Sequence, residues 1–436
     1  MISKVKDFLN KRFIKNVLVL VTGTAAAQAI TMATAPVITR LYGPEAFGVM
    51  GTFNALVSVI VPIAALTYPI AIVLPKQEKE AKAIFKLSIL ISFILSIFIF
   101  IILLLFKDSI AILLNMEHIS NYFYLLPIVI VFSGFMQVMT QWLIRIKEFT
   151  INAKATVIQS LIVNLSKIGV GLFLPIAQVL IFFTAISNGL RGLLMYIISN
   201  RQVNRLNIIK LFKSKGNIKE VAKKHKDFPL YRAPQDLLFA LQQSFPIILL
   251  TSFFGPIATG YYTISRSVLS MPTLLIGKAV ADAFYPRASE TFNRGEDISS
   301  ILIKSTLGLL VVGLVPFGVI IAFGPTIFAF VFGSDWYSAG EYARWIALWS
   351  YTTLINRPSI MTLPVLNAQR FHLIYTIILA IVNLIALIIG FKVFNSDVMS
   401  VALFSLSGAI ANIFLISITI RLSKTIKVTK GQSKYS

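Results

Sequence analysis

The sequence contains no cysteine and few charged residues for its length. Only 13% of its 436 residues are charged, whereas a soluble domain carries about 25%. The absence of cysteine excludes disulfide bonds and thiolate metal sites. The three histidines, His118, His225 and His372, lie far apart in the chain, so we expect neither a histidine metal cluster nor a metal cofactor.

Catalytic and nucleotide-binding motifs are also missing. The sequence has no P-loop, so ATP bound to this chain is not its expected source of energy. The longest segment expected outside the membrane on one side, residues 324–341, holds only Asp335 and Glu341 as acids. A membrane enzyme such as a polymerase or glycosyltransferase would need an acidic or catalytic constellation or a large outer loop. We therefore predict that the protein is not an enzyme.

What the sequence does contain is long apolar blocks. It is 57% hydrophobic with a mean hydropathy of +0.82, and the block Ile84–Phe106 has one charge, Lys86. About 20 apolar residues cross the hydrocarbon core as a helix, and helices satisfy their own backbone groups in lipid. We predict an all-α polytopic membrane protein with about twelve spans, over residues 14–40, 45–73, 84–106, 121–144, 154–174, 176–199, 233–254, 257–285, 301–323, 342–366, 372–394 and 398–420.

The basic residues are distributed unevenly between the two sides of the predicted membrane. The net charge is +23, and loops on the side of the N-terminus hold 31 Lys and Arg residues, whereas the opposite loops hold four. Such a bias marks the cytoplasmic side, and an even number of spans places both termini there. Because the basic residues lie in short loops between apolar blocks, nucleic acid is not an expected partner.

The longest loop, residues 200–232, divides the chain in the middle. Its segments Ile208–Lys215 and Val221–Lys226 alternate apolar residues with lysines, which predicts amphipathic helices on anionic membrane lipids. We therefore expect an N-terminal lobe of six spans over residues 1–199, a basic linker, a second lobe of six spans over 233–420, and a basic tail over 421–436.

A short pattern occurs once in each half. The hexapeptide that begins with Gly43-Pro44 and ends at Gly48 shares four of six positions with the one from Gly255-Pro256 to Gly260. Each lies between the first two spans of its half, so chance recurrence of common turn residues is the weaker alternative. Proline and glycine favour tight turns. Both halves start from the same side, which predicts a pseudo-two-fold axis along the membrane normal. Arg40 and Glu45 flank only the first copy, and we expect the two turns to form an outer gate of asymmetric charge.

The stretch Arg40-Leu-Tyr-Gly-Pro-Glu-Ala-Phe-Gly48, after a first span with Gln28 and Pro36, resembles the N-terminal signature of the Wzx-like O-antigen and polysaccharide flippases. These form the polysaccharide transporter family of the multidrug/oligosaccharidyl-lipid/polysaccharide exporter superfamily. The resemblance implies a MATE-like fold of two six-helix lobes around a cavity that opens alternately to each side of the bacterial inner membrane. It also implies an undecaprenyl-pyrophosphate-linked oligosaccharide as cargo, with a polysaccharide polymerase and chain-length machinery as partners.

Seven charged residues fall well inside the predicted spans, and five of them are basic. A charge at the centre of a membrane helix costs about 2.5–3.5 kcal/mol on insertion scales. A surplus of cations is suited to an anionic cargo, since arginine binds phosphate oxygens bidentately. We predict that the basic residues line the cavity and contact the pyrophosphate: Arg266, Arg357, Lys167, Arg191 and Lys278. Of these, Arg266 and Arg357 have no carboxylate one turn away, and Pro358 should bend the helix beside Arg357.

Local pairing is the alternative for several of these charges. Lys278 and Asp282 lie four residues apart on one helix face, as do Arg232 and Asp236. Lys167 and Arg191 could instead snorkel or bridge the fifth and sixth spans.

The coupling ion is the least defined part of the prediction. The first span, Val17–Thr39, has no carboxylate, whereas proton-coupled multidrug exporters of the superfamily resemble one another in having one there. A drug or metabolite exporter of the same fold is therefore the weaker alternative. A peptidoglycan-precursor flippase, usually of fourteen spans, is another. Such relatives can bind sodium, and oxygen ligands for Na⁺, or a site for H⁺, are expected from Asp236, Asn383 and Asp282, with the membrane potential as a further driving force.

Overall fold

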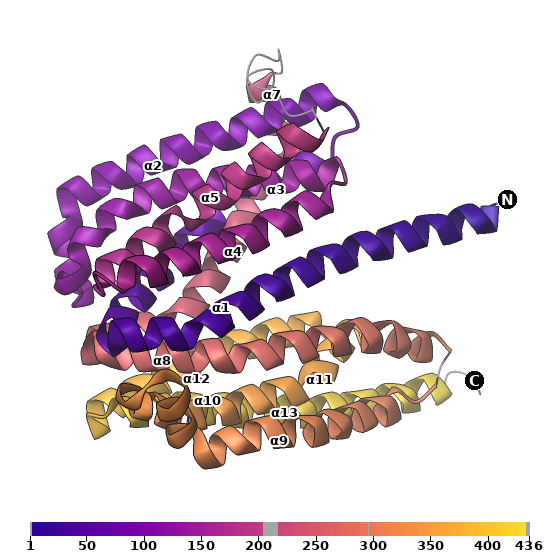
Figure 1. Ribbon diagram of the computed structural model, residues 1–436. Coiled ribbons are helices and arrows are strands. Elements are labelled where there is room, and N and C mark those ends of the chain that lie inside the picture. Colours follow the sequence, from indigo (N-terminus) through magenta and orange to yellow (C-terminus); the bar gives the residue numbers. More distant parts are fainter. Residues whose placement is uncertain (1, 204–216, 295, 433–436) are drawn as a thin grey trace. The chain divides into compact units, whose positions relative to one another are not determined.

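The computed structural model describes residues 2–203, 217–294 and 296–432, and within these ranges the chain forms helices and no β-strand (Figure 1). In the described residues, eight apolar stretches are long enough to cross a membrane. Two of them, Val19–Ile63 and Phe228–Thr273, have 45 and 46 residues and fold back at a glycine, so each supplies two spans. Two further segments, α4 (Phe149–Gly171) and the pair α10–α11 (337–365), complete the twelve predicted spans. The prediction of an all-α polytopic membrane protein is confirmed.

The other helices have the following bounds: α1 Ile2–Ile60, α2 Glu78–Leu114, α3 Leu126–Arg145, α5 Ala177–Val203, α7 Ile218–Lys224, α8 Ala233–Asn293, α9 Ile298–Phe332, α10 Tyr337–Ile355, α11 Arg357–Val365, α12 Gln369–Phe394 and α13 Asp397–Gln432. Shorter 3-10 or π turns cover Val61–Ile63, Tyr68–Val73, Glu117–Leu125, Phe228–Arg232 and Ser334–Trp336.

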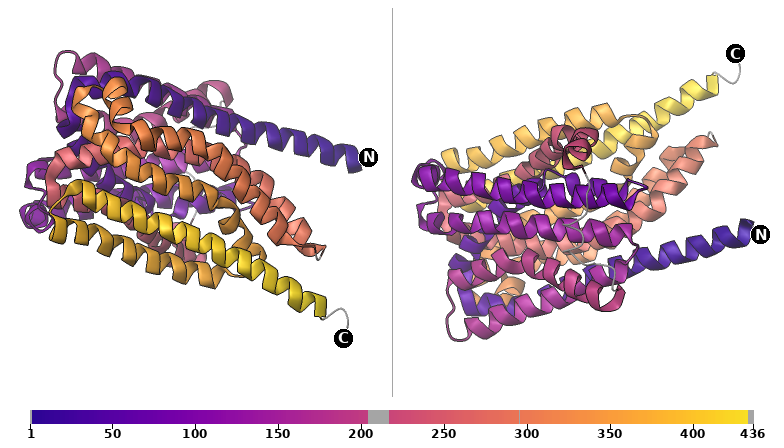
Figure 2. Two further views of the ribbon diagram at one scale, coloured as in Figure 1. Left: turned by 90° about the horizontal axis from the view of Figure 1, so that it is seen from below. Right: turned by 90° about the horizontal axis from the view of Figure 1, so that it is seen from above.

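The chain divides into two compact units, Met1–Pro256 and Ile257–Ser436. In the first, α1 packs on α4, α4 on α5, α5 on α3 and α3 on α2; in the second, α9 packs on α10, and α13 on both α10 and α12 (Figures 1 and 2). The first part of α8 packs on α1, and the boundary between the units follows Pro256. The division into lobes at 200–232 stays a prediction.

The two Gly-Pro turns have the same backbone conformation. Gly43 has φ 70° and ψ 173°, and Gly255 has φ 79° and ψ −171°. This combination of positive φ and extended ψ is populated almost only by glycine. Pro44 and Pro256 follow directly, at the first position of the next helical segment, where their missing N–H is tolerated. The repeated sequence pattern therefore corresponds to the same turn conformation in both places.

The predicted span over residues 45–73 is wrong in its second part. The α-helix ends at Ile60, and the chain continues in two short 3-10 turns. Leu66 and Thr67, between these turns, have positive φ angles of 47° and 58°. Pro62 and Pro69 lack the N–H groups that a continuing helix requires, which explains why apolar composition alone overestimated this helix.

The linker also differs from its prediction. Helix α7 turns its apolar side toward protein rather than lipid, because Val221 is only 5% exposed and belongs to the same apolar core as Trp142. Tyr68, in the second 3-10 turn, donates its hydroxyl to the carbonyl of Ala222 at 3.1 Å. The other predicted amphipathic segment, Ile208–Lys215, lies outside the described residues.

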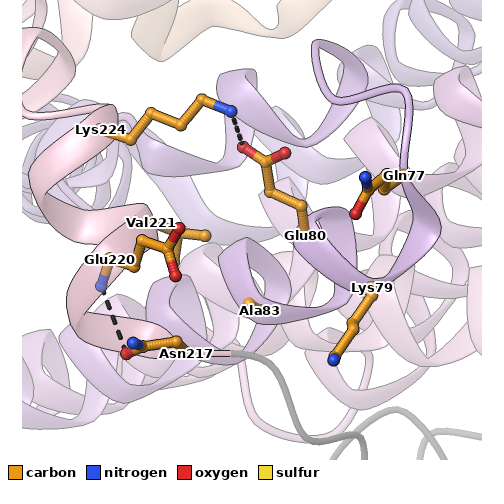
Figure 3. Close-up of a pocket in the computed structure, with 8 residues that line it drawn as sticks. All are labelled: Gln77, Lys79, Glu80, Ala83, Asn217, Glu220, Val221 and Lys224. Carbon is orange, nitrogen blue, oxygen red and sulfur yellow. Dashed lines mark hydrogen bonds and ion pairs between the residues drawn. The ribbon is translucent and has the colours of Figure 1, made fainter.

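Charged groups fasten α7 to the start of α2. The Glu80 carboxylate lies 2.6 Å from Lys224 Nζ, as Figure 3 shows, and it also lies 3.3 Å from His225 Nε2. Glu80 and Lys224 line a pocket of about 250 Å³, together with Gln77 and Lys79. The linker is thus a docked element of the first unit over its second part.

Candidate functional site

Two predicted cavity cations of the first unit join α4 to α5. Lys167 on α4 is partly buried and donates from Nζ to Thr184 Oγ1 on α5 at 3.2 Å. Arg191 on α5 donates from Nη2 to Asn152 Oδ1 on α4 at 2.9 Å, and its buried Nε has no partner in the described structure. Each cation therefore bridges the fifth and sixth spans through neutral oxygens, and neither has an ion-pair partner among the described residues.

A polar ladder extends along the same pair of helices. Between the two bridges, Gln159 Nε2 on α4 donates to Ser187 Oγ on α5 at 2.7 Å. On the opposite neighbour, Ser160 donates to the carbonyl of Ala27 in α1 at 2.9 Å. Hydrogen bonds of this kind hold membrane helices together where no hydrophobic driving force operates between them. The sequence analysis considered only charged residues and missed these neutral ones. A polar residue in the middle of an apolar span also indicates a contact between helices.

Replacing Lys167 with methionine should stabilise the isolated protein. The ammonium is partly buried with one hydroxyl and the Met50 sulfur, at 3.8 Å, as partners. Replacing a buried ion pair by apolar residues of similar volume is often neutral or stabilising by about 1–4 kcal/mol, and for this single ammonium with neutral partners we expect the lower end. The measurement is the thermal midpoint in detergent. Lys154→Met, at an exposed position on the same helix, is the matched control and should leave the midpoint unchanged. A lower midpoint for Lys167→Met alone would mean that the ammonium is structural.

The second unit places Arg357 at a break between two helices. α10 ends at Ile355 and α11 begins at Arg357, with Pro358 next, so the helix is interrupted beside this arginine. The Arg357 side chain lies against α8, where a Cβ added to Gly277 would be 3.0 Å from Arg357 Nε. That Nε is buried without a hydrogen-bond partner, and in the described part of the chain no carboxylate pairs with the guanidinium.

The other predicted cations of this unit lie on α8. The Arg266 guanidinium lies over the ring of Tyr262, 5.9 Å from its centroid, on the same helix. Tyr262 is fully buried, so the stacking fixes the stem of the arginine against the core. The side chains of Lys278 and Asp282 lie outside the described residues, and the predicted pair between them stays a prediction.

The predicted coupling residues occupy different kinds of environment. Asp236 pairs with Arg232 one turn earlier, at 3.2 Å, which is the local pairing given as the alternative. Asn383 on α12 is nearly buried, and its Oδ1 accepts from Ser407 Oγ on α13 at 2.7 Å. Within the described residues, no group of three or more His, Asp or Glu side chains is placed to hold a metal ion.

The two Gly-Pro turns meet within the first unit. A Cβ added to Gly48 would overlap the carbonyl group of Pro256 and lie 2.9 Å from its Cα. One turn further on, the buried hydroxyls of Thr52 and Thr251 are 2.6 Å apart. Arg40 and Glu45 are exposed beside this contact, as a charged outer gate would require. Gly260, the last residue of the second hexapeptide, is buried and belongs to the second unit.

A buried amide network surrounds the helix break, and the sequence did not single it out. Asn356 is fully buried and donates from Nδ2 to Asn412 Oδ1 on α13 at 2.9 Å. Asn412 in turn donates to Thr353 Oγ1 at 3.0 Å. Asn356 Oδ1 is buried without a partner in the described structure. The network holds α10 and α13 together at the residue before Arg357, so it positions the arginine.

Three comparisons with known proteins bear on this arrangement. No curated protein sequence matches the chain. A multidrug resistance MATE family transporter of the MOP superfamily, in an inward-facing conformation, has a TM-score of 0.74 at 16% identity, over 92% of this chain and 96% of that one. The lipid II flippase MurJ, in an inward closed conformation, has a TM-score of 0.67 at 14% identity, over 94% and 90%. A MOP superfamily transporter from Pyrococcus furiosus has a TM-score of 0.59 at 14% identity, over 95% and 96%.

These solved structures establish the fold, which is MATE-like as predicted. The family follows from the sequence itself. Residues 37–341 match a family model described as polysaccharide biosynthesis protein. The match begins just before the first Gly-Pro turn, includes the second and ends early in α10, so it covers most of the chain. The protein therefore belongs to this polysaccharide biosynthesis family, as a helical polytopic membrane protein.

Proposed function

We propose that the protein flips an undecaprenyl-pyrophosphate-linked oligosaccharide, an O-antigen, capsule or exopolysaccharide repeat unit, from the cytoplasmic to the outer leaflet of the bacterial inner membrane. The observation that carries the proposal is Arg357. Its guanidinium lies in a membrane-spanning segment, at a helix break, against a glycine and without a carboxylate partner in the described structure. Such a group is costly in a membrane unless it binds an anion or faces water.

The other cations extend this argument. Lys167 and Arg191 have only neutral partners, so their charges are not compensated within the described protein. With Arg266, and with Lys278 outside the described side chains, they supply positive charge for an anionic head group in both halves of the chain. The polysaccharide biosynthesis family supports a sugar as the remainder of the cargo. A pyrophosphate offers oxygens in the geometry that guanidinium binds bidentately.

The fold is shared with multidrug transporters, so the fold alone does not choose the cargo. The absence of a carboxylate in residues 17–39 favours the flippase over a proton-coupled drug exporter. The likeness to a lipid II flippase keeps a peptidoglycan precursor as a second lipid-linked cargo.

The lobes over residues 1–199 and 233–420 alternate in access, with the Gly-Pro turns as the outer gate and both termini in the cytoplasm. Energy comes from the membrane potential or from Na⁺ or H⁺ at Asp236, Asn383 and Asp282. Asp236 would first have to leave Arg232. A polymerase and its chain-length machinery receive the product.

The test is deletion of the gene and analysis of lipid-linked sugars. We expect a lipid-linked oligosaccharide to accumulate in the cytoplasmic leaflet, where an added periplasmic glycosidase cannot reach it, and wild-type protein to restore its exposure. Normal exposure of the oligosaccharide in the deletion strain would contradict the proposal. Loss of drug resistance in that strain with normal exposure would indicate the exporter instead.

A further inference from the structure

An apolar groove lies between α8 and α9 of the second unit. Its volume is about 300 Å³. Its walls are two stripes of residues three or four positions apart, which therefore lie on one face of each helix. They are Val280, Phe284 and Arg287 on α8, and Ile301, Ser305 and Gly308 on α9.

The depth of the groove depends on Gly308. No atom lies within 4 Å of a Cβ added there, so the space opposite this glycine is open. On the same face of α9, one and two turns after Gly308, Val312 is 57% exposed and Val315 is 69% exposed. Large apolar side chains this exposed on a membrane-spanning helix contact lipid chains. The groove thus opens toward hydrocarbon, and a hydrocarbon chain is the matching occupant.

One end of the groove is cationic. Arg287 is exposed, follows Phe284 by one turn, and lies toward the connection between α8 and α9. Glu290 is one turn further on, yet it forms no ion pair with Arg287 in the described structure. From Ile301 to Leu309 the groove is about 12 Å long at 1.5 Å per residue, close to the roughly 15 Å of one leaflet's hydrocarbon. A chain that fills it would therefore bring its phosphate to Arg287.

We propose that this groove binds one anionic glycerophospholipid, with an acyl chain between α8 and α9 and its phosphate on Arg287. The site is separate from the pyrophosphate site, and it stands whether or not the proposed cargo is correct. It touches the same helix, since Val280 lies one turn from the glycine that contacts Arg357. Met361 of α11 packs against the cluster that contains Phe284. The bound lipid therefore contacts the part of α8 that packs against Arg357.

The experiment uses the purified full-length protein in nanodiscs that contain a trace of lipid with a photoreactive acyl chain. Phosphatidylglycerol is compared with phosphatidylcholine of identical chains, and labelled peptides are identified by mass spectrometry. We expect labelling of the α8 and α9 peptides to favour phosphatidylglycerol. Arg287→Gln should weaken this labelling about tenfold, the loss expected for a hydrogen bond to a charged group. Gly308→Leu should abolish labelling by both lipids.

Two control variants match these changes. Arg294→Gln alters an exposed arginine outside the groove, in the connection between α8 and α9, and Gly318→Leu fills equally open space elsewhere on α9. Both should label like wild type. Equal labelling by the two lipids, unchanged in Arg287→Gln, would overturn the proposal and indicate bulk lipid only. Displacement of phosphatidylglycerol by equimolar polyprenyl phosphate would overturn it in favour of the chain of the cargo. If Gly308→Leu does not fold, the labelling of Arg287→Gln tests the proposal by itself. This variant should fold, because the Arg287 side chain is exposed.

Discussion

Alanine at position 48 is expected to remove about 3 kcal/mol or more of the free energy of unfolding and most of the folded protein. Gly48 contacts the backbone carbonyl of Pro256, so the added methyl group would meet a group that cannot rotate away. α1 and α8 would have to separate, and the buried bond between Thr52 and Thr251 would break. The measurement is the thermal midpoint and the monodisperse yield of the purified protein.

Gly169→Ala is the matched control. Gly169 lies inside α4, and a Cβ added there meets nothing within 4 Å. The same substitution should therefore stabilise this helix by about 0.5–1 kcal/mol, because alanine loses less backbone entropy than glycine. A Gly48→Ala protein that melts with the wild type would show that the two turns do not pack as described.

The positions of the helices were predictable because lipid allows few solutions. Apolar blocks about 20 residues long must be helical, and the Gly-Pro pattern predicted turns after residues 40 and 254. The contact between Gly48 and Pro256 was not predictable, because it joins segments far apart in the sequence. The linker was misjudged for a related reason: the apolar side of α7 fits lipid and protein equally well, and only the tertiary fold shows that Val221 reaches the Trp142 core.

The charged residues of the candidate site could be predicted from the sequence, whereas the neutral residues that hydrogen-bond to them could not. Charges inside apolar spans are rare, and so Arg357 and Lys167 stood out from composition alone. Their neutral partners, such as Thr184 and Asn152, are common residues that acquire meaning only when α4 and α5 are placed side by side. The pairing of Asp236 with Arg232 was predictable, since it depends only on helical periodicity.

Removing the Arg357 side chain is expected to lower export about 10- to 100-fold without destabilising the protein. The loss corresponds to the 1.5–3 kcal/mol of a hydrogen bond to a charged group, at 1.4 kcal/mol per factor of ten. Stability should hold or rise in Arg357→Ala, because Nε is buried without a hydrogen-bond partner and no carboxylate pairs with the guanidinium in the described structure. Arg357→Lys should recover only part of the rate, since an ammonium does not bind phosphate bidentately. The measurements are exposure of the lipid-linked oligosaccharide and the thermal midpoint.

A second substitution tests whether the position of Arg357 matters as well as its charge. In Gly277→Ala the new methyl group would be 3.0 Å from Arg357 Nε, so the arginine must shift by a few tenths of an ångström while keeping its charge. Export should fall in this variant too, whereas Arg370→Ala, which removes an exposed arginine at the start of α12, should export like wild type. Wild-type export by Arg357→Ala at normal expression would exclude this residue from cargo binding. Loss of both export and folding would instead make the arginine a structural support, so the two measurements together separate a binding role from a packing role.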